Sequence, residues 1–346
     1  MEIPDALRVA LSELAEEYPI AALARAASRL SAAYRVDQSS QANQADRGEQ
    51  TDESSPSAAV GAPLDAAAYA LTRLPATFAA LVAALDAARL RRPDWRPMTL
   101  LDAGAGPGVA AWAARAVWPS LTRATLLERD QRMLALGQRL MRQAPAGCAV
   151  SWLQADLTAE REPLSGAPFD LCIASYALNE LPLAARRPLT LRLWRACGGA
   201  LALVAPGTPA GFAAIREARA WLIAAGAQII APCPHADACP MPTGDWCHFA
   251  QRLARSRLHR RLKGGEAPFE DEKYSYVIAS REPGEPFAAR VIRHPAVHPG
   301  RIALDLCAPD GLMRAEITRS DAAWRAARQA RWGSALASLP DNARER

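Results

Sequence analysis

The sequence has almost no lysine, no long apolar run and no basic start. Lys263 and Lys273 are two of its 41 basic residues, and the others are arginines, whose planar guanidinium suits phosphates and stacked bases. No apolar run approaches the roughly 20 residues that span a bilayer, so we expect no membrane partner. The first residues, MEIPDALRVALSELAEEYPI, are too acidic for a signal or transit peptide. We therefore expect a cytoplasmic protein.

Cysteine is also scarce, and four of the seven cysteines form one pattern. Cys233, Cys239 and Cys247 lie within fifteen residues, and Cys307 follows sixty residues later. In a reducing compartment such cysteines indicate metal ligands, and four thiolates can hold a zinc ion or an iron–sulfur cluster. The gaps of five, seven and fifty-nine residues exceed the roughly two to four typical of zinc pairs, which favours the cluster. The alternative is a group of small buried apolar residues.

The N-terminal third reads as helices joined by a polar connector. Residues 1–35 repeat apolar positions at helical spacing, and 36–60 have almost none, which predicts a disordered linker. A second helical region, 61–97, contains a predicted helix over Leu64–Leu90 that Pro75 should start or kink.

From residue 98 to 230, short apolar strands alternate with helical stretches. The strands are expected at 98–103, 124–128, 149–153, 169–175 and 199–205. This alternation predicts an α/β core with a parallel, doubly wound, Rossmann-like sheet.

Three further regions follow this core. Residues 231–272 hold the cysteine-rich segment and a basic helix, and 273–332 hold a last core strand, a small β appendage and a second basic helix, Asp321–Arg331. Residues 333–346 are expected to be a tail. The first basic helix has seven cationic or imidazole side chains and no acid, which favours contact with RNA phosphates; they are Arg252, Arg255, Arg257, His259, Arg260, Arg261 and Lys263.

A glycine loop follows the first core strand, in Asp102-Ala-Gly104-Ala-Gly106-Pro-Gly108. Glycines between a strand and a helix let a ligand approach the backbone closely. Glu128 ends the second strand and Asp156 follows the third. These residues would lie at the carboxyl edge of the sheet, where open α/β sheets bind ligands.

The fourth strand ends in SYALNEL, which places Asn179 and Glu180 at the same edge. These two side chains are the candidates for orienting an acceptor; their other interpretation is a helix cap and an exposed acid. The segment lacks the Asp/Asn-Pro-Pro-aromatic motif of many amino-group methylating enzymes and the Pro-Cys of cytosine-C5 enzymes. Cys172 and Cys197 are therefore expected to be core residues.

The acid before the glycines, and the spacing of the acids, resemble class I S-adenosylmethionine-dependent methyltransferases. The resemblance implies that Asp102 and the three glycines lie at the amino-acid and ribose part of the cofactor. It assigns Glu128 to the ribose hydroxyls and Asp156 to the adenine amino group.

Longer motifs resemble the bacterial branch of a methyltransferase-like family associated with the small ribosomal subunit, whose mitochondrial members are the Rsm-twenty-two type. The motifs are YALTRLPATFAAL, LLDAGAGPG, SYALNEL, CPH…CP…WCHF and KYSYV. The resemblance implies a 4Fe-4S cluster on the four cysteines. His235 and His248 are the candidate substitutes if one cysteine is not a ligand, and zinc is the alternative that the cysteine spacing leaves open. It also implies contact with the small ribosomal subunit and its rRNA.

Three functions stay open on the sequence. The first is an rRNA methyltransferase, and the second is a non-catalytic assembly factor that keeps the fold as a scaffold. The third is a small-molecule methyltransferase with a structural zinc, which the basic helix disfavours. In each case we expect a monomer.

Overall fold

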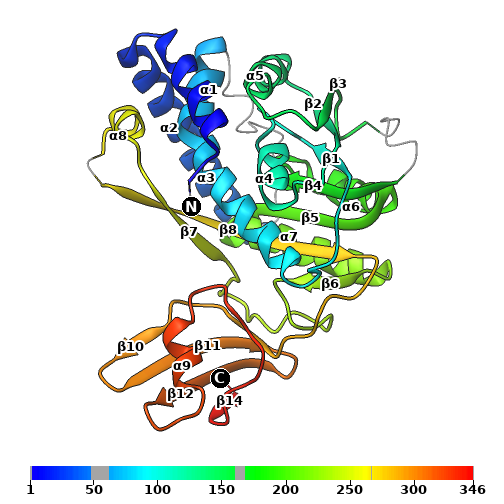
Figure 1. Cartoon of the computed structure of the whole chain (residues 1–346), viewed down its shortest axis with the longest axis vertical. Helices are drawn as coiled ribbons and strands as arrows, with labels where there is room; N and C mark the ends of the chain where they lie inside the picture. The colour runs from blue at the N-terminus through cyan, green and yellow to red at the C-terminus, as the bar shows by residue number, and fades with distance from the viewer. Residues whose placement is uncertain (1, 48–61, 160–167, 266, 346) are drawn as a thin grey trace.

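A mixed eight-stranded sheet forms the centre of the computed structural model, which describes residues 2–47, 62–159, 168–265 and 267–345 (Figure 1). The strand order is β3-β2-β1-β4-β5-β8-β6, with β7 paired to β8. The strands are β1 (Thr99–Ala103), β2 (Arg123–Glu128), β3 (Ala149–Gln154), β4 (Phe169–Ser175), β5 (Cys197–Pro206), β6 (Gln228–Ala231), β7 (Phe249–Ala254) and β8 (Phe269–Ser280).

The five strands expected from the sequence lie within two residues of β1–β5 at each end. β4 and β5 are buried along most of their length, as continuous apolar strands in a covered sheet should be. The order, with its reversal between β1 and β4, is that of class I methyltransferases, so the predicted fold class is confirmed.

The sheet is parallel at the five predicted strands and mixed beyond them. β1–β5 are parallel, but β8 runs antiparallel to β5, β6 and β7. Its residue Tyr274 pairs with both Pro206, at the carboxyl end of β5, and Phe249 of β7. The β7–β8 ribbon therefore projects beyond the carboxyl edge of the sheet, and β8 enters the sheet from that edge.

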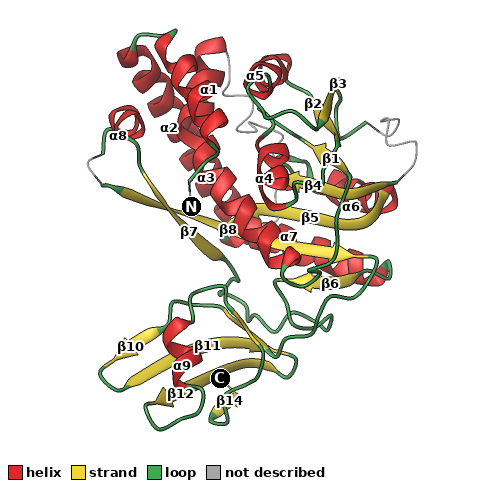
Figure 2. Cartoon of the chain, viewed as in Figure 1, coloured by secondary structure: helices red, strands yellow, loops and turns green. Residues whose placement is uncertain are grey.

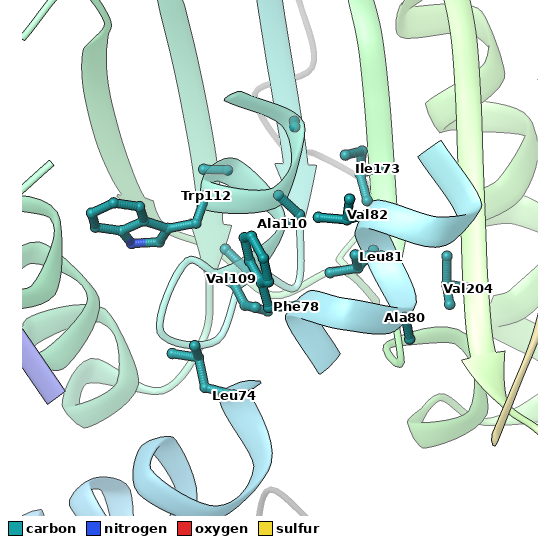
Figure 3. Packing of buried hydrophobic residues seen from close by; sticks show 14 of the residues in the cluster. Leu74, Phe78, Ala80, Leu81, Val82, Val109, Ala110, Trp112, Ile173 and Val204 are labelled. Carbon is teal, nitrogen blue, oxygen red and sulfur yellow. The ribbon is translucent and has the colours of Figure 1, made fainter. Parts of the chain in front are cut away.

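A long helix, α3 (Pro63–Arg89), packs on one face of the sheet and is buried almost all round. Figure 3 shows Phe78 and Leu81 of α3 among Val109 of α4, Ile173 of β4 and Val204 of β5. The alanine-rich composition of the helix lets it lie close to its neighbours. The helix continues through Pro75 rather than starting there, because packing on all sides outweighs the one backbone hydrogen bond that proline removes.

The expectation that no apolar stretch approaches a membrane span needs correction at this helix. By length and composition, Pro63–Arg89 is apolar enough to cross a bilayer, with a mean hydropathy of 1.4 over its most apolar window. However, 78% of that window is buried inside the protein. The apolar surface is therefore used to join the N-terminal helices to the sheet.

Two further helices, α1 (Asp5–Glu16) and α2 (Ile20–Arg47), contact α3. α2 continues beyond the predicted boundary at residue 35, so the first part of the expected linker is helical. The stretch 36–47 contains neither glycine nor proline, so nothing in it stops a helix before Gly48. The rest of the predicted linker, 48–60, lies outside the described residues.

Helices between the strands complete the core (Figure 2). They are α4 (Val109–Val117), α5 (Gln131–Met141), η2 (Leu178–Glu180), α6 (Leu183–Ala196) and α7 (Pro209–Ala224). Two begin at side-chain caps. Asp130 accepts from the backbone N–H groups of Arg132 and Met133, and Thr208 accepts from that of Gly211. Cys172 of β4 and Cys197 of β5 are buried, as expected for core residues.

The C-terminal part forms a second sheet with its own apolar core. Its order is β13-β9-β11-β12-β14, with β10 paired to β11. The elements are β9 (Ala289–Val291), β10 (Ala296–His298), β11 (Arg301–Ala308), β12 (Gly311–Thr318), α9 (Trp324–Gln329), β13 (Ala335–Leu336) and β14 (Ala343–Glu345). The predicted tail from residue 333 thus contributes two strands.

The basic segment after the cysteines is not one helix. Its first residues form β7, and only Arg257–Lys263 form a helix, α8. Phe249 and Leu253 are buried while Arg252 is exposed, a strand pattern that the run of arginines concealed. α8 contacts α2 and α3, so the tip of the ribbon is held against the N-terminal helices.

Candidate cofactor site and cysteine cluster

The glycine loop adopts a backbone that other residues would find strained. Gly104, Gly106 and Gly108 have φ values of 75°, 54° and 84°. A Cβ on Gly104 would lie 2.8 Å from that of Ala177, so the loop touches the segment after β4. A Cβ on Gly106 would meet nothing within 4 Å among the described residues. The loop is therefore tight on its inner side and open at Gly106.

Asp102 is fully buried beneath this loop. Neither carboxyl oxygen has a hydrogen-bond partner among the described residues. Burial, with Glu128 as the second cause, raises the pKa of Asp102 to about 8. A buried carboxylate without a partner is costly, so its position suits a ligand that brings a cation or hydrogen-bond donors.

Glu128 holds the loop from the end of β2. One carboxylate oxygen accepts from the N–H of Gly106 at 2.7 Å, and the other from that of Asp130 at 2.8 Å. Burial raises the pKa of Glu128, although these two backbone bonds oppose the shift. The residue assigned to the ribose by resemblance thus also fixes the shape of the glycine loop.

Asp156 follows β3, whose last residue, Gln154, pairs with Glu128. The Asp156 carboxylate accepts hydrogen bonds from the backbone N–H and the hydroxyl of Thr158, at 2.9 and 2.7 Å. These hydrogen bonds lower the pKa of Asp156. The structure therefore places Asp102, Glu128 and Asp156 along one edge of the sheet, while their contacts to a cofactor stay predictions.

The end of β4 presents a residue to which the sequence analysis gave no role. The backbone of Tyr176 has a φ of 59°, which is unusual for a residue other than glycine. The Tyr176 hydroxyl donates to Glu272 of β8 at 3.2 Å, and Glu272 also lies 3.6 Å from Arg73 of α3. Burial, and then Glu272, raise the pKa of Tyr176 well above its usual value. The signal in the sequence was an aromatic residue directly after a strand end.

Asn179 and Glu180 lie in η2, just after Tyr176. The side-chain oxygen of Asn179 is buried and has no hydrogen-bond partner among the described residues. Arg186 donates to the backbone carbonyl of Asn179 at 3.4 Å. Asn179 therefore has a free acceptor at the strand end, and the roles of both residues stay predictions.

The four cysteines come together from separate parts of the chain. Burial raises the pKa of Cys247 well above its usual value, and the other three thiols add to the shift. Burial raises the pKa of Cys307 to about 12, again with Cys233 and Cys239 contributing. Three of the four contact a buried apolar cluster of Phe212, Met241 and Ile292; they are Cys239, Cys247 and Cys307.

Among the described residues, no group of three or more His, Cys, Asp or Glu side chains has an arrangement that could hold a metal ion. The donor set itself consists of four neighbouring thiols with no disulfide among them. His235 joins it, with its Nε2 atom 3.7 Å from the sulfur of Cys307. His248 instead stacks on Trp246, with ring centroids 5.2 Å apart.

Two buried arginines border the cysteines. Arg219 of α7 is 5% exposed and Arg290 of β9 is 4% exposed. Both act against burial by lowering the pKa of Cys233 and Cys307. One nitrogen of each guanidinium has no hydrogen-bond partner in the described parts of the chain. These two unpaired N–H donors could hydrogen-bond a negatively charged group that is bound by the four cysteines as thiolates.

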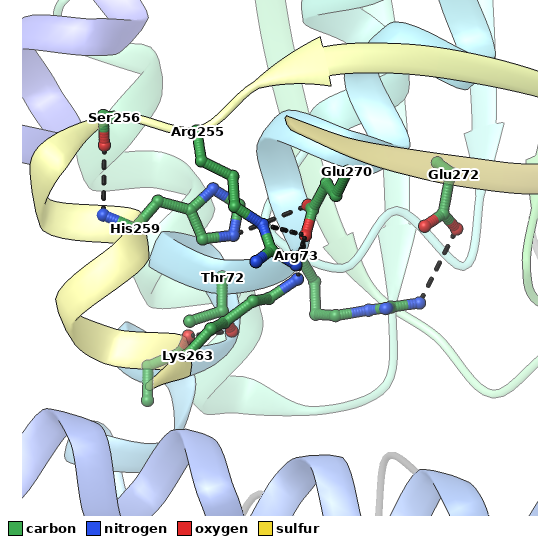
Figure 4. Close-up of polar contacts among 9 residues, drawn as sticks. Thr72, Arg73, Arg255, Ser256, His259, Lys263, Glu270 and Glu272 are labelled. Atoms are coloured by element: carbon green, nitrogen blue, oxygen red, sulfur yellow. Dashed lines mark hydrogen bonds and ion pairs between the residues drawn. The ribbon is translucent and has the colours of Figure 1, made fainter. Parts of the chain in front are cut away.

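Three of the six cations in the basic segment are paired with acids, namely Arg252, Arg255 and Lys263, which corrects the expectation of a uniformly free basic surface. Figure 4 shows Glu270 of β8 facing Arg255, Lys263 and His259. The Glu270 carboxylate lies 3.0 Å from Arg255 and 2.7 Å from Lys263. Burial lowers the pKa of His259 to about 4, so this imidazole is uncharged at neutral pH.

Arg252 is paired as well, at 2.8 Å from Asp271, its cross-strand partner on β8. These ion pairs could not be predicted from the basic run, because their acids, Glu270 and Asp271, follow it in the sequence. Three arginines of α8 have no ion pair with described residues, namely Arg257, Arg260 and Arg261.

Two comparisons at the level of sequence give the same family. A family model described as mitochondrial small ribosomal subunit Rsm22 matches residues 63–337. The human mitochondrial ribosome assembly protein METTL17 is 31% identical over 296 residues, which are 80% of this chain and 63% of that protein. The mitochondrial Rsm22-cox11 tandem protein 2 of Schizosaccharomyces pombe is 26% identical, over 77% of this chain and 42% of that protein. The chain thus spans less than two thirds of these relatives.

Two solved structures with low similarity to this chain are described as methyltransferases. An O-methyltransferase family protein from Burkholderia thailandensis has a TM-score of 0.42 and 15% identity, covering 65% of this chain and 62% of that one. Magnesium protoporphyrin IX methyltransferase from Synechocystis has a TM-score of 0.39 and 14% identity, covering 71% and 93%. The fold assignment rests on the strand order of this chain rather than on these scores.

The buried Asp102 predicts a dependence of stability on pH. An unfolded aspartate has a pKa of about 4, whereas that of Asp102 in the folded protein is about 8. Between these values the folded carboxyl keeps a proton that the unfolded one has lost, so stability falls as pH rises through this window. The Asp102→Asn variant should melt like the wild type near pH 4. It should melt several degrees higher near pH 8.

The measurement is thermal unfolding of the ligand-free protein between pH 4 and 9, with the exposed Asp94→Asn as control. A difference between Asp102→Asn and wild type that does not change with pH would contradict the account.

Proposed function

Because residues 63–337 match its model, the chain belongs to the Rsm22 family, and we propose that it acts in assembly of the small ribosomal subunit. The proposed partner is the one in the descriptions of the matching family and relative, which refer to the small ribosomal subunit and to ribosome assembly. The observation that carries it is the family match over residues 63–337. A ribosomal partner also suits a chain with a net charge of +5.

S-adenosylmethionine is the cofactor proposed for the glycine loop. When bound, it supplies an electrophilic methyl group on a sulfonium. Asp102 would compensate positive charge on the amino-acid part, and the open side of Gly106 would admit the ligand. Glu128 would bind the ribose hydroxyls and Asp156 the adenine amino group. The unpartnered carboxylate of Asp102 supports this fit.

A 4Fe-4S cluster is proposed for Cys233, Cys239, Cys247 and Cys307, with zinc as the alternative. The proximity of the four thiols and the leftover donors of Arg219 and Arg290 support an anionic thiolate-bound group. Three ligands lie between β6 and β7, and the fourth is on β11 of the second sheet. Such a cluster would link the C-terminal sheet to the core and make folding depend on metal supply.

RNA contact is proposed for the free face of α8. Arg257 and Arg261 are exposed, and Arg260 is half-buried. The β7–β8 ribbon carries them beyond the carboxyl edge, the side on which the glycine loop lies. RNA held there would lie on the same side of the sheet as the proposed cofactor.

Methyl transfer is the second candidate function. It is favoured by the buried, unpartnered side-chain oxygen of Asn179 at the end of β4. Tyr176 is not suited to remove a proton at neutral pH, since its hydroxyl is bound to Glu272 and its pKa is raised. A non-catalytic assembly factor needs only to bind its partner, whereas a methyltransferase needs an acceptor positioned in line with the methyl group.

Replacing Glu128 tests the cofactor site. Glu128→Ala removes the hydrogen bond to Gly106 of the loop, the one to Asp130 and the proposed ribose contact. We expect about 10- to 100-fold weaker S-adenosylmethionine binding by calorimetry. Glu282→Ala, an exposed acid paired with Arg92, is the control. Equal affinity of Glu128→Ala and wild type would contradict the site. Labelled methyl transferred to small-subunit RNA, and lost in Glu128→Ala, would establish the enzyme.

Replacing one cysteine tests the metal. Protein purified without oxygen should contain about four iron atoms and absorb visible light, and Cys239→Ser should lose both and melt earlier. Cys148→Ser, at a half-buried cysteine outside the group, should change neither. Stoichiometric zinc in place of iron would contradict the 4Fe-4S assignment and favour the zinc alternative.

The α8 surface is tested by the salt dependence of RNA binding. Replacing Arg257, Arg260 and Arg261 by glutamine should lower the slope of log affinity against log salt by up to about 2–3. The charge-neutral control replaces the ion pair Arg252–Asp271 by glutamine and asparagine. An unchanged slope in the triple variant would exclude α8 as the contact.

A further inference from the structure

A pocket of about 530 Å³ lies on the C-terminal sheet, away from the glycine loop and the cysteines. It is bordered by the turn between β10 and β11, the residue after β12, and one side of α9, elements that lie together in Figure 1. Its main polar and aromatic lining residues are His298, Arg319, Trp324 and Arg328. The proposed function uses none of them.

Two cations of the pocket are not neutralised. Arg319 and Arg328 are exposed, and neither has an ion pair or side-chain hydrogen bond with the described residues. The neighbouring acids are engaged elsewhere. Glu316 pairs with Arg301 at 3.3 Å, and Asp321 accepts from the N–H and hydroxyl of Thr318. Between residues 289 and 331 the sequence has eight arginines and four carboxylates, so the pocket lies in a positive part of the surface.

Trp324 supplies an aromatic surface in the same pocket as these cations. It is half-buried and packs against the apolar core of the C-terminal sheet, which fixes its ring, while it also lines the pocket. Val297 at the rim is 70% exposed, and Ile302 at the base is buried. A fixed aromatic ring next to unpaired guanidinium groups is the combination that binds an unstacked base and its phosphates.

We propose that this pocket binds single-stranded RNA, with one unpaired base stacked on Trp324 and the adjoining phosphates on Arg319 and Arg328. This inference rests on the proposed function and adds a second RNA contact to that of α8. A duplex is the poorer fit, because its bases are stacked inside and cannot reach Trp324. An acidic peptide would use the arginines and leave the aromatic ring without a specific role.

The test measures binding of the full chain to a fluorescent single-stranded 12-nucleotide RNA by anisotropy across salt concentrations. Trp324→Ala should weaken binding by about 5- to 150-fold, and Trp324→Phe should retain most of the affinity. Replacing Arg319 and Arg328 by glutamine should lower the salt slope by about 1.4. The control replaces the paired Arg314 and Asp305 by glutamine and asparagine and should bind as wild type.

Loss of binding in Trp324→Ala with rescue by phenylalanine supports the inference when the arginine variant also lowers the salt slope. Trp324 packs on the C-terminal core, so phenylalanine would restore folding too, whereas a folding defect does not follow from replacing the exposed Arg319 and Arg328. Wild-type affinity and slope in all pocket variants would overturn it, and the proposed function would stand if the α8 variant still lost binding. Stronger binding of an acidic peptide than of RNA would also overturn it. A wild-type chain that binds no RNA would overturn both the inference and the proposed rRNA contact.

Discussion

The pairing of β8 is the constraint on which the rest of the structure depends. Its second half lies between β5 and β6 in the sheet, and its first half pairs with β7 beyond the carboxyl edge. The same strand carries Glu272, which binds Tyr176 next to the glycine loop, and Glu270, which holds α8. It also donates from Ser275 to the carbonyl of Cys247 at 2.8 Å. The segment next to the glycine loop, the cysteines and the basic helix are thus positioned by one strand.

Local features of the sequence were enough to predict much of this fold. β1–β5 were found because buried strands read as short apolar runs, and the glycine loop because it follows a strand and precedes a helix. The alignment of Asp102, Glu128 and Asp156 on one edge follows from parallel strands alone. These predictions need no knowledge of contacts between distant residues.

Other features depend on pairing across long sequence distances and were out of reach. The pairing of Arg252 with Asp271 cancels a charge that a count of arginines treats as free. The buried state of His259 has the same origin, since it arises from contacts of α8 with other helices. The unusual backbone of Tyr176 and the leftover donors of Arg219 appear only when neighbouring elements are in place. In each case tertiary contacts decide what a charged or aromatic side chain can do.

One chain of the Rsm22 family thus carries the glycine loop proposed to bind S-adenosylmethionine and two positive surfaces proposed to bind RNA, on α8 and on the C-terminal sheet. The central claim about this chain is its association with the small ribosomal subunit. Gradient co-sedimentation of the oxygen-free purified chain with small-subunit particles from cells lacking the protein tests it most directly. The account predicts that the chain migrates with immature particles and not with large subunits. A chain that stays at the top of the gradient, with metal loaded and particles intact, would contradict it.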